Sequence, residues 1–387
     1  MRRLARLLAP VLSLILLLAA AGAAQTVAQL PPESVQKIEA AISSEMARQN
    51  LAGMSVAIAV DNRLVYANGF GLADLENSVP ATAETVYRTA SIAKPITATG
   101  IMLLAEQGKL DLDAPIQKYC PAFPDKPWPV TARQLLGHLG GIRHYKSGGE
   151  ATGTKHYFTI ADSLDTFKDE PLLHEPGSKY QYSTYGYSVL GCVLEGASGM
   201  SYEDFLRARV FGPAGMSQTR TDNHYELIPR RARGYQKLSQ RQYDSLPEAA
   251  QRIARVGAHY NADMHDTSMK VPGGGLVSTA ADLVRLALAY QNNTLLKAET
   301  KQQMWTRQRT KDGPETGYGL GWGVGEFHGH ASVSHGGAQA GTRTFLGILP
   351  EQGIVVALMC NTEGVDFGVL LDAIGAVALG EEAAPKK

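Results

Sequence analysis

The stretch Ser91-Ile92-Ala93-Lys94 lies where a strand-rich beginning of the chain gives way to helices. It opens a segment whose apolar residues keep helical spacing as far as Gln107, and Gly108 is placed as a C-terminal stop. Two strand-like runs precede it, Met54 to Val60 and Leu64 to Ala67, with an Asp/Asn turn between them. The pattern predicts a β-hairpin followed by a helix whose first turn carries a serine and a lysine.

Strand patterns return only near the C-terminus. Between about 96 and 300 the spacing indicates helices and long loops, including a polar stretch at 237–268 that is typical of an insertion or a long loop. The later strand runs and a final helix lie at 321–324, 344–349, 354–360 and 368–379. We therefore expect one sheet built from both ends of the chain, an inserted helical subdomain, and a ligand cleft between them.

The composition excludes two classes of protein. The 387 residues include 37 Lys+Arg and 37 Asp+Glu, which gives a formal net charge of zero, and 44% are hydrophobic. A nucleic-acid-binding protein needs a basic excess, and a disordered chain needs low hydrophobicity with high net charge. The composition predicts a folded protein without a nucleic-acid partner.

The first residues have the pattern of an export signal. Arg2, Arg3 and Arg6 precede the apolar run Leu7 to Ala20, and small residues follow at 21–24. This order is typical of a secretory signal peptide, here residues 1–24, and the run is short for a membrane span. A retained N-terminal anchor is the alternative. We expect a periplasmic or secreted mature chain, mildly acidic and without a stable membrane span.

The three cysteines, Cys120, Cys192 and Cys360, are widely separated and form no CxxC motif. In an exported chain one pair could form a disulfide, and three buried free thiols are the alternative. The cysteines carry no functional signal.

Ser91 and Lys94 are three residues apart on a helix, so their side chains can touch. A serine hydroxyl becomes a good nucleophile when a neighbouring base takes its proton, and a lysine desolvated in a cleft can be that base. The free N–H groups at a helix N-terminus can stabilise an oxyanion. The same S-x-x-K pattern occurs at 34–37, on a helix that we expect to face solvent, so the pattern needs context.

Two further segments supply that context. Residues 179–185 are unusually aromatic, and a tyrosine beside a lysine can act as a general acid or base, although core packing under a loop is the alternative. In Ser334-His335-Gly336-Gly337-Ala338, the glycines allow the backbone to approach a ligand closely, and its N–H groups can pair with a carbonyl.

In this order and spacing, the three segments resemble the S-x-x-K, Y-x-N and H/K-x-G motifs of the serine β-lactamase and penicillin-binding-protein superfamily. The resemblance covers about residues 35–380 and leans toward the class C branch, which includes DD-peptidases, esterases and the mitochondrial serine β-lactamase-like subgroup. It implies an α/β (α+β) fold, with an antiparallel sheet flanked by helices. The sheet subdomain would comprise about 35–95 and 318–380, and the helical subdomain about 96–317.

The resemblance also implies roles for individual residues. Ser91 would be the acylated nucleophile, Lys94 its proton acceptor, and Tyr182 the group that assists acylation and activates the deacylating water. The strand His335-Gly336-Gly337 would form a wall of the site, and the N–H groups of Ser91 and Ala338 would form the oxyanion hole. Such two-step acyl transfer requires no metal or organic cofactor.

Two residues depart from the family pattern. Thr184 stands where the motif has Asn, so an amide that could contact substrate or position Lys94 is missing. His335 stands where many relatives have Lys, and histidine is only partly cationic at neutral pH. We therefore expect weak β-lactamase activity and tighter binding of anionic substrates at lower pH. Arg343 is an alternative partner for a substrate carboxylate.

Other histidines carry weaker signals. His328-Gly329-His330 could be read as part of a metal cluster, but ordinary loop histidines are the favoured interpretation. His138 and His144 flank a glycine turn near the expected cleft, where structural hydrogen bonding is favoured. Region 237–268 could cover the cleft or lie on the surface.

The sequence thus predicts an exported serine hydrolase that acts on amide or ester bonds of a small molecule or peptide. The alternative is a penicillin-binding sensor or assembly module that keeps the fold with little turnover. The sequence leaves the oligomeric state open.

Overall fold

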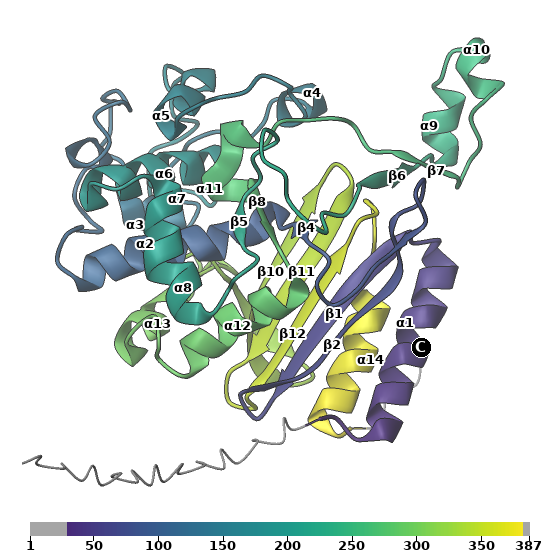
Figure 1. The fold of residues 1–387 in the computed structure, drawn as a ribbon. Coiled ribbons are helices and arrows are strands. Elements are labelled where there is room, and N and C mark those ends of the chain that lie inside the picture. The colour runs from purple at the N-terminus through teal and green to yellow at the C-terminus, as the bar shows by residue number, and fades with distance from the viewer. Residues whose placement is uncertain (1–28, 382–387) are drawn as a thin grey trace, which may run out of the picture.

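The computed structural model describes residues 29–381, and its centre is a seven-stranded antiparallel sheet in the order β3-β2-β1-β12-β11-β10-β9. The strands are β1 (Gly53–Val60), β2 (Arg63–Asp74), β3 (Val79–Pro80), β9 (Gly323–Phe327), β10 (His330–Gln339), β11 (Thr342–Leu349) and β12 (Ile354–Cys360). The predicted antiparallel sheet flanked by helices is confirmed (Figure 1).

Strand β1 joins the two ends of the chain. It pairs with β2 in a hairpin and with β12 on its other side, where Met54 lies opposite Cys360. Its side chains alternate between two apolar clusters: Val56 and Ile58 face one, and Ala57 and Ala59 face the other. Because both faces of β1 are covered, the strand is an almost unbroken apolar run.

Helices cover both faces of this sheet (Figure 1). The first and last helices, α1 (Pro32–Gln49) and α14 (Gly368–Leu379), pack against each other and cover one face. On the other face, α12 (Ala280–Gln291) packs against β1, β2 and β12. This helix lies within the range that we assigned to the helical subdomain, so the sheet uses a helix from the middle of the chain; the subdomain boundaries stay a prediction.

The remaining elements lie mainly beside the sheet. The helices are α2 (Ala93–Glu106), α3 (Ala132–Leu136), α4 (Gly148–Ala151), α5 (Ile160–Ser163), α6 (Thr184–Ser198), α7 (Tyr202–Leu206), α8 (Gly212–Ala214), α9 (Gln240–Asp244), α10 (Glu248–Gln251), α11 (Val271–Gly274) and α13 (Ala298–Met304). The short strands are β4 (Tyr87–Arg88), β5 (Arg220–Thr221), β6 (Tyr235–Lys237), β7 (His259–Asn261) and β8 (Leu276–Ser278). Short 3-10 or π segments occur at 90–92, 116–118, 164–166, 207–211 and 268–270.

Two strands differ from the expectations based on residue patterns. Strand β2 continues beyond Ala67 to Asp74, through Gly69 and Gly71, and β10 contains Gly336-Gly337. Glycine is a poor strand former, so local preference does not reveal either strand. A side chain at Gly69 would lie within 2.4 Å of the backbone of the segment at residues 81–82, which shows why the close approach there needs glycine.

Region 237–268 is not a featureless loop. Strands β6 and β7 pair with each other, and α9 and α10 lie between them, projecting from the body of the protein (Figure 1).

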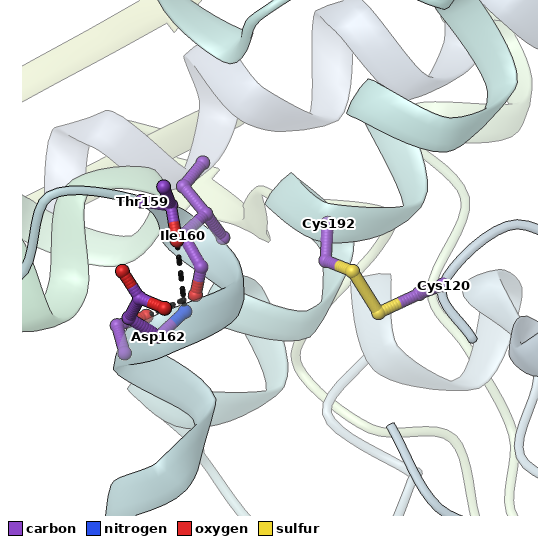
Figure 2. Close-up of a disulfide and its surroundings, with 6 residues drawn as sticks. Cys120, Thr159, Ile160, Asp162 and Cys192 are labelled. Carbon is purple, nitrogen blue, oxygen red and sulfur yellow. Dashed lines mark hydrogen bonds between the residues drawn. A yellow bond between two sulfur atoms is a disulfide. The ribbon is translucent and has the colours of Figure 1, made fainter. Parts of the chain in front are cut away.

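Cys120 and Cys192 form a disulfide (Figure 2). Cys360 is free and buried. The bond joins the segment after residues 116–118 to α6. A side chain at Gly196 of α6 would lie 1.7 Å from the carbonyl oxygen of Tyr119, so the helix packs closely on that segment. Of the two alternatives that the sequence left open, the structure has the disulfide.

The expected signal peptide, residues 1–24, lies outside the described residues. Within 29–381, no helix combines the length and the apolar character that crossing a membrane requires.

Candidate active site

Ser91 lies in a tight turn between β4 and α2. Ala90, the residue before it, has a φ of 48°, a left-handed conformation that is uncommon for a residue with a side chain. The turn is held from both sides: the Thr89 N–H donates to the carbonyl of Leu276 at 2.9 Å, and the Thr344 hydroxyl donates to the carbonyl of Thr89 at 2.8 Å. Strands β8 and β11 therefore fix the position from which Ser91 enters the pocket.

The Ser91 hydroxyl lies between Lys94 and Tyr182. Lys94 Nζ is 3.0 Å from Ser91 Oγ, and the Tyr182 hydroxyl donates to the same oxygen at 2.9 Å. Lys94 follows one turn later on α2, whereas Tyr182 comes from the segment just before α6. The structure thus brings together the three residues that the motifs placed in the catalytic centre.

Lys94 is fully buried, and burial decides its protonation state. Burial, and then the positive charge of Lys270, hold the pKa of Lys94 well below the ordinary value of 10.5. Its Nζ also donates to the carbonyl of Gly273 at 2.7 Å and lies 4.8 Å from the centre of the Tyr182 ring. A lysine with a lowered pKa has a larger neutral fraction at neutral pH, which is the form that can accept a proton from serine.

Tyr182 has the opposite shift. Burial raises the pKa of its hydroxyl well above 10, against the lowering effect of its hydrogen bond to Ser91. The side chain is therefore a neutral donor in the resting site. This state suits a proton relay between Ser91 and the leaving group better than a standing tyrosinate base.

Thr184 replaces one contact that the missing Asn could make. Its hydroxyl oxygen lies 3.2 Å from Lys94 Nζ and is buried at the start of α6. The Thr184 methyl group also packs against Gly273, where an added side chain would approach it to 2.6 Å. Thr184 can position Lys94, although it lacks the amide that could contact a substrate amide.

A pocket of about 420 Å³ opens at Ser91, and Tyr182 and Thr184 also border it. Strand β10 borders the same pocket through Gly336 and Ala338, which follow the alternation of a strand. Gly337 is on the other face, where an added side chain would lie 2.5 Å from the Thr89 carbonyl. The strand wall implied by the resemblance is present, with Ala338 placed beside Ser91.

The expectation that a partly cationic His335 makes the binding of anionic substrates depend on pH is wrong. The side chain is buried on the face of β10 away from the pocket, with Nε2 2.8 Å from the Tyr318 hydroxyl and Nδ1 2.7 Å from the Gly336 carbonyl. A carbonyl only accepts, so Nδ1 carries the proton and Tyr318 donates to Nε2. Burial, and then the charge of Lys94, lower the pKa of His335 to about 3. His335 stays neutral from pH 5.5 to 8 and cannot make anion binding depend on pH.

Among the described residues, Lys270 is one of two cationic side chains that border this pocket, and unlike Arg343 it was not indicated by the sequence. Lys270 lies just before α11 in the chain and borders the pocket. Its side chain is 3% exposed, and its Nζ donates to the carbonyl of Ala151 at 2.9 Å. Burial, and then the charge of Arg88, lower the pKa of Lys270 to about 8. It is a charged partner near neutral pH. Arg343 also borders the pocket, where its Nη1 lies 3.4 Å from the Gly337 carbonyl.

The second S-x-x-K match, at residues 34–37, has no comparable buried environment. Lys37 on α1 is exposed and pairs with Glu33 at 2.9 Å. The contrast with buried Lys94 shows which of the two matches has the environment of a base.

The remaining histidines near the site hold backbone groups. The Ser183 N–H donates to His138 Nδ1 and the Thr184 N–H to His144 Nδ1, each at 3.2 Å. These contacts fit the structural role that we favoured. Residues 328–329 form the hairpin turn between β9 and β10, and His330 begins β10. None of the residues of region 237–268, all of which are described, borders the Ser91 pocket.

Comparisons with known proteins show the family of this chain. The Beta-lactamase family model matches residues 38–379. The human protein named Serine beta-lactamase-like protein LACTB, mitochondrial, is 30% identical over 420 aligned residues, covering 81% of this chain and 74% of its own. Esterase EstB of Burkholderia gladioli is 27% identical, with 82% and 84% covered. Among solved structures, the D-amino acid amidase of Ochrobactrum anthropi SV3 with D-phenylalanine has a TM-score of 0.76 at 25% identity, with 89% of this chain and 98% of that chain covered.

The family match extends over nearly all of the described residues, from α1 to α14, and the human relative aligns with most of both chains. This chain therefore belongs to the beta-lactamase family.

Proposed function

We propose that this chain is an exported serine hydrolase of the class C-like branch that cleaves amide or ester bonds through an acyl-enzyme on Ser91. The observation that carries the proposal is the position of Ser91 Oγ, within 3.0 Å of both Lys94 Nζ and the Tyr182 hydroxyl and at the border of a pocket. Its relatives include an esterase, and its structural neighbours include a D-amino acid amidase.

In the acylation step, neutral Lys94 accepts the proton of Ser91 as Oγ forms a bond to the substrate carbonyl carbon. The N–H groups of Ser91 and Ala338 bind the oxygen that becomes negatively charged. The bond to the leaving amine or alcohol then breaks, and the Lys94 proton reaches the leaving group through the Tyr182 hydroxyl. Each proton removed from Ser91 is thus returned to the product.

In the deacylation step, water takes the place of the leaving group. As the water oxygen attacks the acyl carbon, neutral Lys94 accepts its proton by relay through the Tyr182 hydroxyl, and the same proton passes to Ser91 Oγ when the ester bond breaks. These residues suffice for the hydrolysis of an amide or an ester.

Lys270 indicates a substrate with an anionic group. The positively charged side chain of Lys270 borders the same pocket as Ser91, whereas His335 is neutral and faces away from that pocket. The preferred substrates would be carboxylate-bearing peptides or esters, in the manner of a DD-peptidase or esterase, with weak β-lactamase activity because Thr184 lacks the amide.

Replacement of Lys270 by Met should raise KM for a carboxylate-bearing substrate about tenfold or more, since a charged hydrogen bond contributes about 1.5–3 kcal/mol. The KM for the matched methyl ester should change little. In the wild type, KM for the anionic substrate should rise as pH passes about 8, because Lys270 loses its charge above its pKa. Lys179→Met, at an exposed lysine near Tyr182, is the control. An equal rise in KM for the carboxylate-bearing substrate and for its methyl ester would refute the role of Lys270 in binding the carboxylate.

The acyl-enzyme itself can be trapped. Mature protein is incubated with a fluorophosphonate or a fluorescent penicillin, and the intact mass is measured for wild type, Ser91→Ala and Ser34→Ala. We expect one adduct on wild type and Ser34→Ala, none on Ser91→Ala, and turnover of p-nitrophenyl esters or D-amino-acid peptides. Equal labelling of all three proteins would reject the nucleophile. An adduct on Ser91 without turnover of any substrate would instead support the alternative function, a penicillin-binding sensor with little turnover.

The disulfide supports the export part of the proposal. Disulfides form and persist in oxidising compartments such as the periplasm, and are rare in the cytosol. Together with the leader-like residues 1–24, the bond between Cys120 and Cys192 favours a periplasmic or secreted enzyme.

A further inference from the structure

Three side chains outside the Ser91 pocket converge on one point. His156 Nδ1 lies 2.6 Å and His224 Nδ1 2.7 Å from the same oxygen, Oδ2 of Asp266. The three residues come from three segments that are far apart in the sequence. His224 and Asp266 line a second pocket of about 770 Å³, and none of the three borders the Ser91 pocket.

The carboxylate of Asp266 is held in place. Its other oxygen, Oδ1, accepts the Ser268 N–H at 2.7 Å, so Oδ2 is left to face the two imidazoles.

Two imidazoles and one carboxylate are a ligand set for zinc. In a tetrahedral site the ligand atoms lie 2.0–2.2 Å from the ion and hence about 3.3 Å from one another. The candidate ligand atoms already lie within 4.8 Å of one another, so small side-chain movements would suffice. The imidazole nitrogens disfavour Mg²⁺ and Ca²⁺, which prefer oxygen ligands.

We propose that His156, His224 and Asp266 bind one Zn²⁺ ion, with water in the fourth position. The side chain of Asp266 is 4% exposed and that of His224 is 44% exposed, so the site is anchored on one side and open to solvent on the other. Aromatic rings shield His156: the centres of Phe158 and Tyr225 lie 4.8 and 4.9 Å from its ring.

The position of the site indicates a structural role. The Asp266 N–H donates to the carbonyl of Gly153, and the neighbouring residues Ala151 and Thr152 border the Ser91 pocket. Lys270, four residues after Asp266, borders that pocket too and donates to Ala151. An ion at this site would tie together the two segments that carry these pocket residues, without touching the reacting atoms.

The test measures zinc binding by the full mature chain, free of any histidine tag and stripped of metal by a chelator. Titration calorimetry with ZnCl₂ and elemental analysis after dialysis are applied to wild type, His224→Gln, Asp266→Asn and His330→Gln. The last variant is the matched control, since it removes a histidine at the start of β10, outside the proposed site. Circular dichroism of the zinc-free proteins shows whether each variant folds.

We expect one Zn²⁺ per chain in wild type and in His330→Gln, and at least about 100-fold weaker binding in the other two variants, because even outer-shell partners of a metal change affinity 10- to 100-fold. When Co²⁺ replaces Zn²⁺, the wild type should show the visible absorption of a tetrahedral Co²⁺ ion. His224→Gln and Asp266→Asn should not show it. No stoichiometric binding in wild type would show that the three residues are only a hydrogen-bonded cluster. Unchanged binding by folded His224→Gln and Asp266→Asn would also overturn the proposal.

Discussion

Lys94→Met should lower kcat/KM for ester or peptide hydrolysis by about 10²–10⁴-fold, the range for loss of a positioned general base. Methionine has a similar length and suits a fully buried position, so the fold should persist while the amine 3.0 Å from Ser91, the proposed proton acceptor, is lost. The measurement is steady-state kinetics on a p-nitrophenyl ester, with the melting temperature followed in parallel.

The other S-x-x-K match provides the control for this experiment. Lys37 is exposed and contacts Glu33, so Lys37→Met should leave kcat/KM unchanged. The wild-type rate should rise with pH as Lys94 loses its proton, and this rise should occur well below pH 10.5 because burial lowers its pKa. Activity of Lys94→Met within tenfold of wild type would remove Lys94 from the mechanism.

The double variant Cys120→Ala/Cys192→Ala should lower the free energy of unfolding by about 2–4 kcal/mol. A disulfide restricts the unfolded chain more as the loop that it closes becomes longer, and this one joins residues 72 positions apart. Denaturant unfolding followed by circular dichroism measures the change.

A reductant provides the matched control for the disulfide. It should destabilise the wild type by a similar amount and leave the double variant unaffected, since Cys360 is free in both proteins. Alkylation under denaturing conditions should find one free thiol in the wild type before reduction and three afterwards. A wild type that keeps its stability in reductant would contradict the prediction.

The hairpin, the helix that follows Ser91 and the strands at the C-terminus could be predicted from the sequence because each has its own apolar period. Helix α2 ends just before Gly108, which has a φ of 67°, as a helix stop requires. Strand β10 could not be found in this way, because Gly336-Gly337 has no strand preference of its own. Its place is set by pairing with β9 and β11 and by the close approach of Gly337 to the Ser91 turn.

The candidate site shows the same division. Ser91, Lys94 and Tyr182 could be named from motifs, since their residue types and order carry the signal. Lys270 could not, because an isolated lysine has no pattern and its importance comes from the pocket that it borders. The error at His335 has the same origin: the sequence indicates a residue that titrates near neutral pH, but burial keeps it neutral.

The sequence by itself determined the type of sheet, the helix that begins just after Ser91 and the family to which the chain belongs, because these depend on local periodicity and on motif order. The tertiary structure alone decided which cysteines pair, which S-x-x-K lysine is buried, that Lys270 borders the Ser91 pocket, and that His156, His224 and Asp266 meet. Each of these depends on contacts between segments distant along the chain. Burial and proximity, which set pKa values and ligand sets, exist only once those segments have packed together.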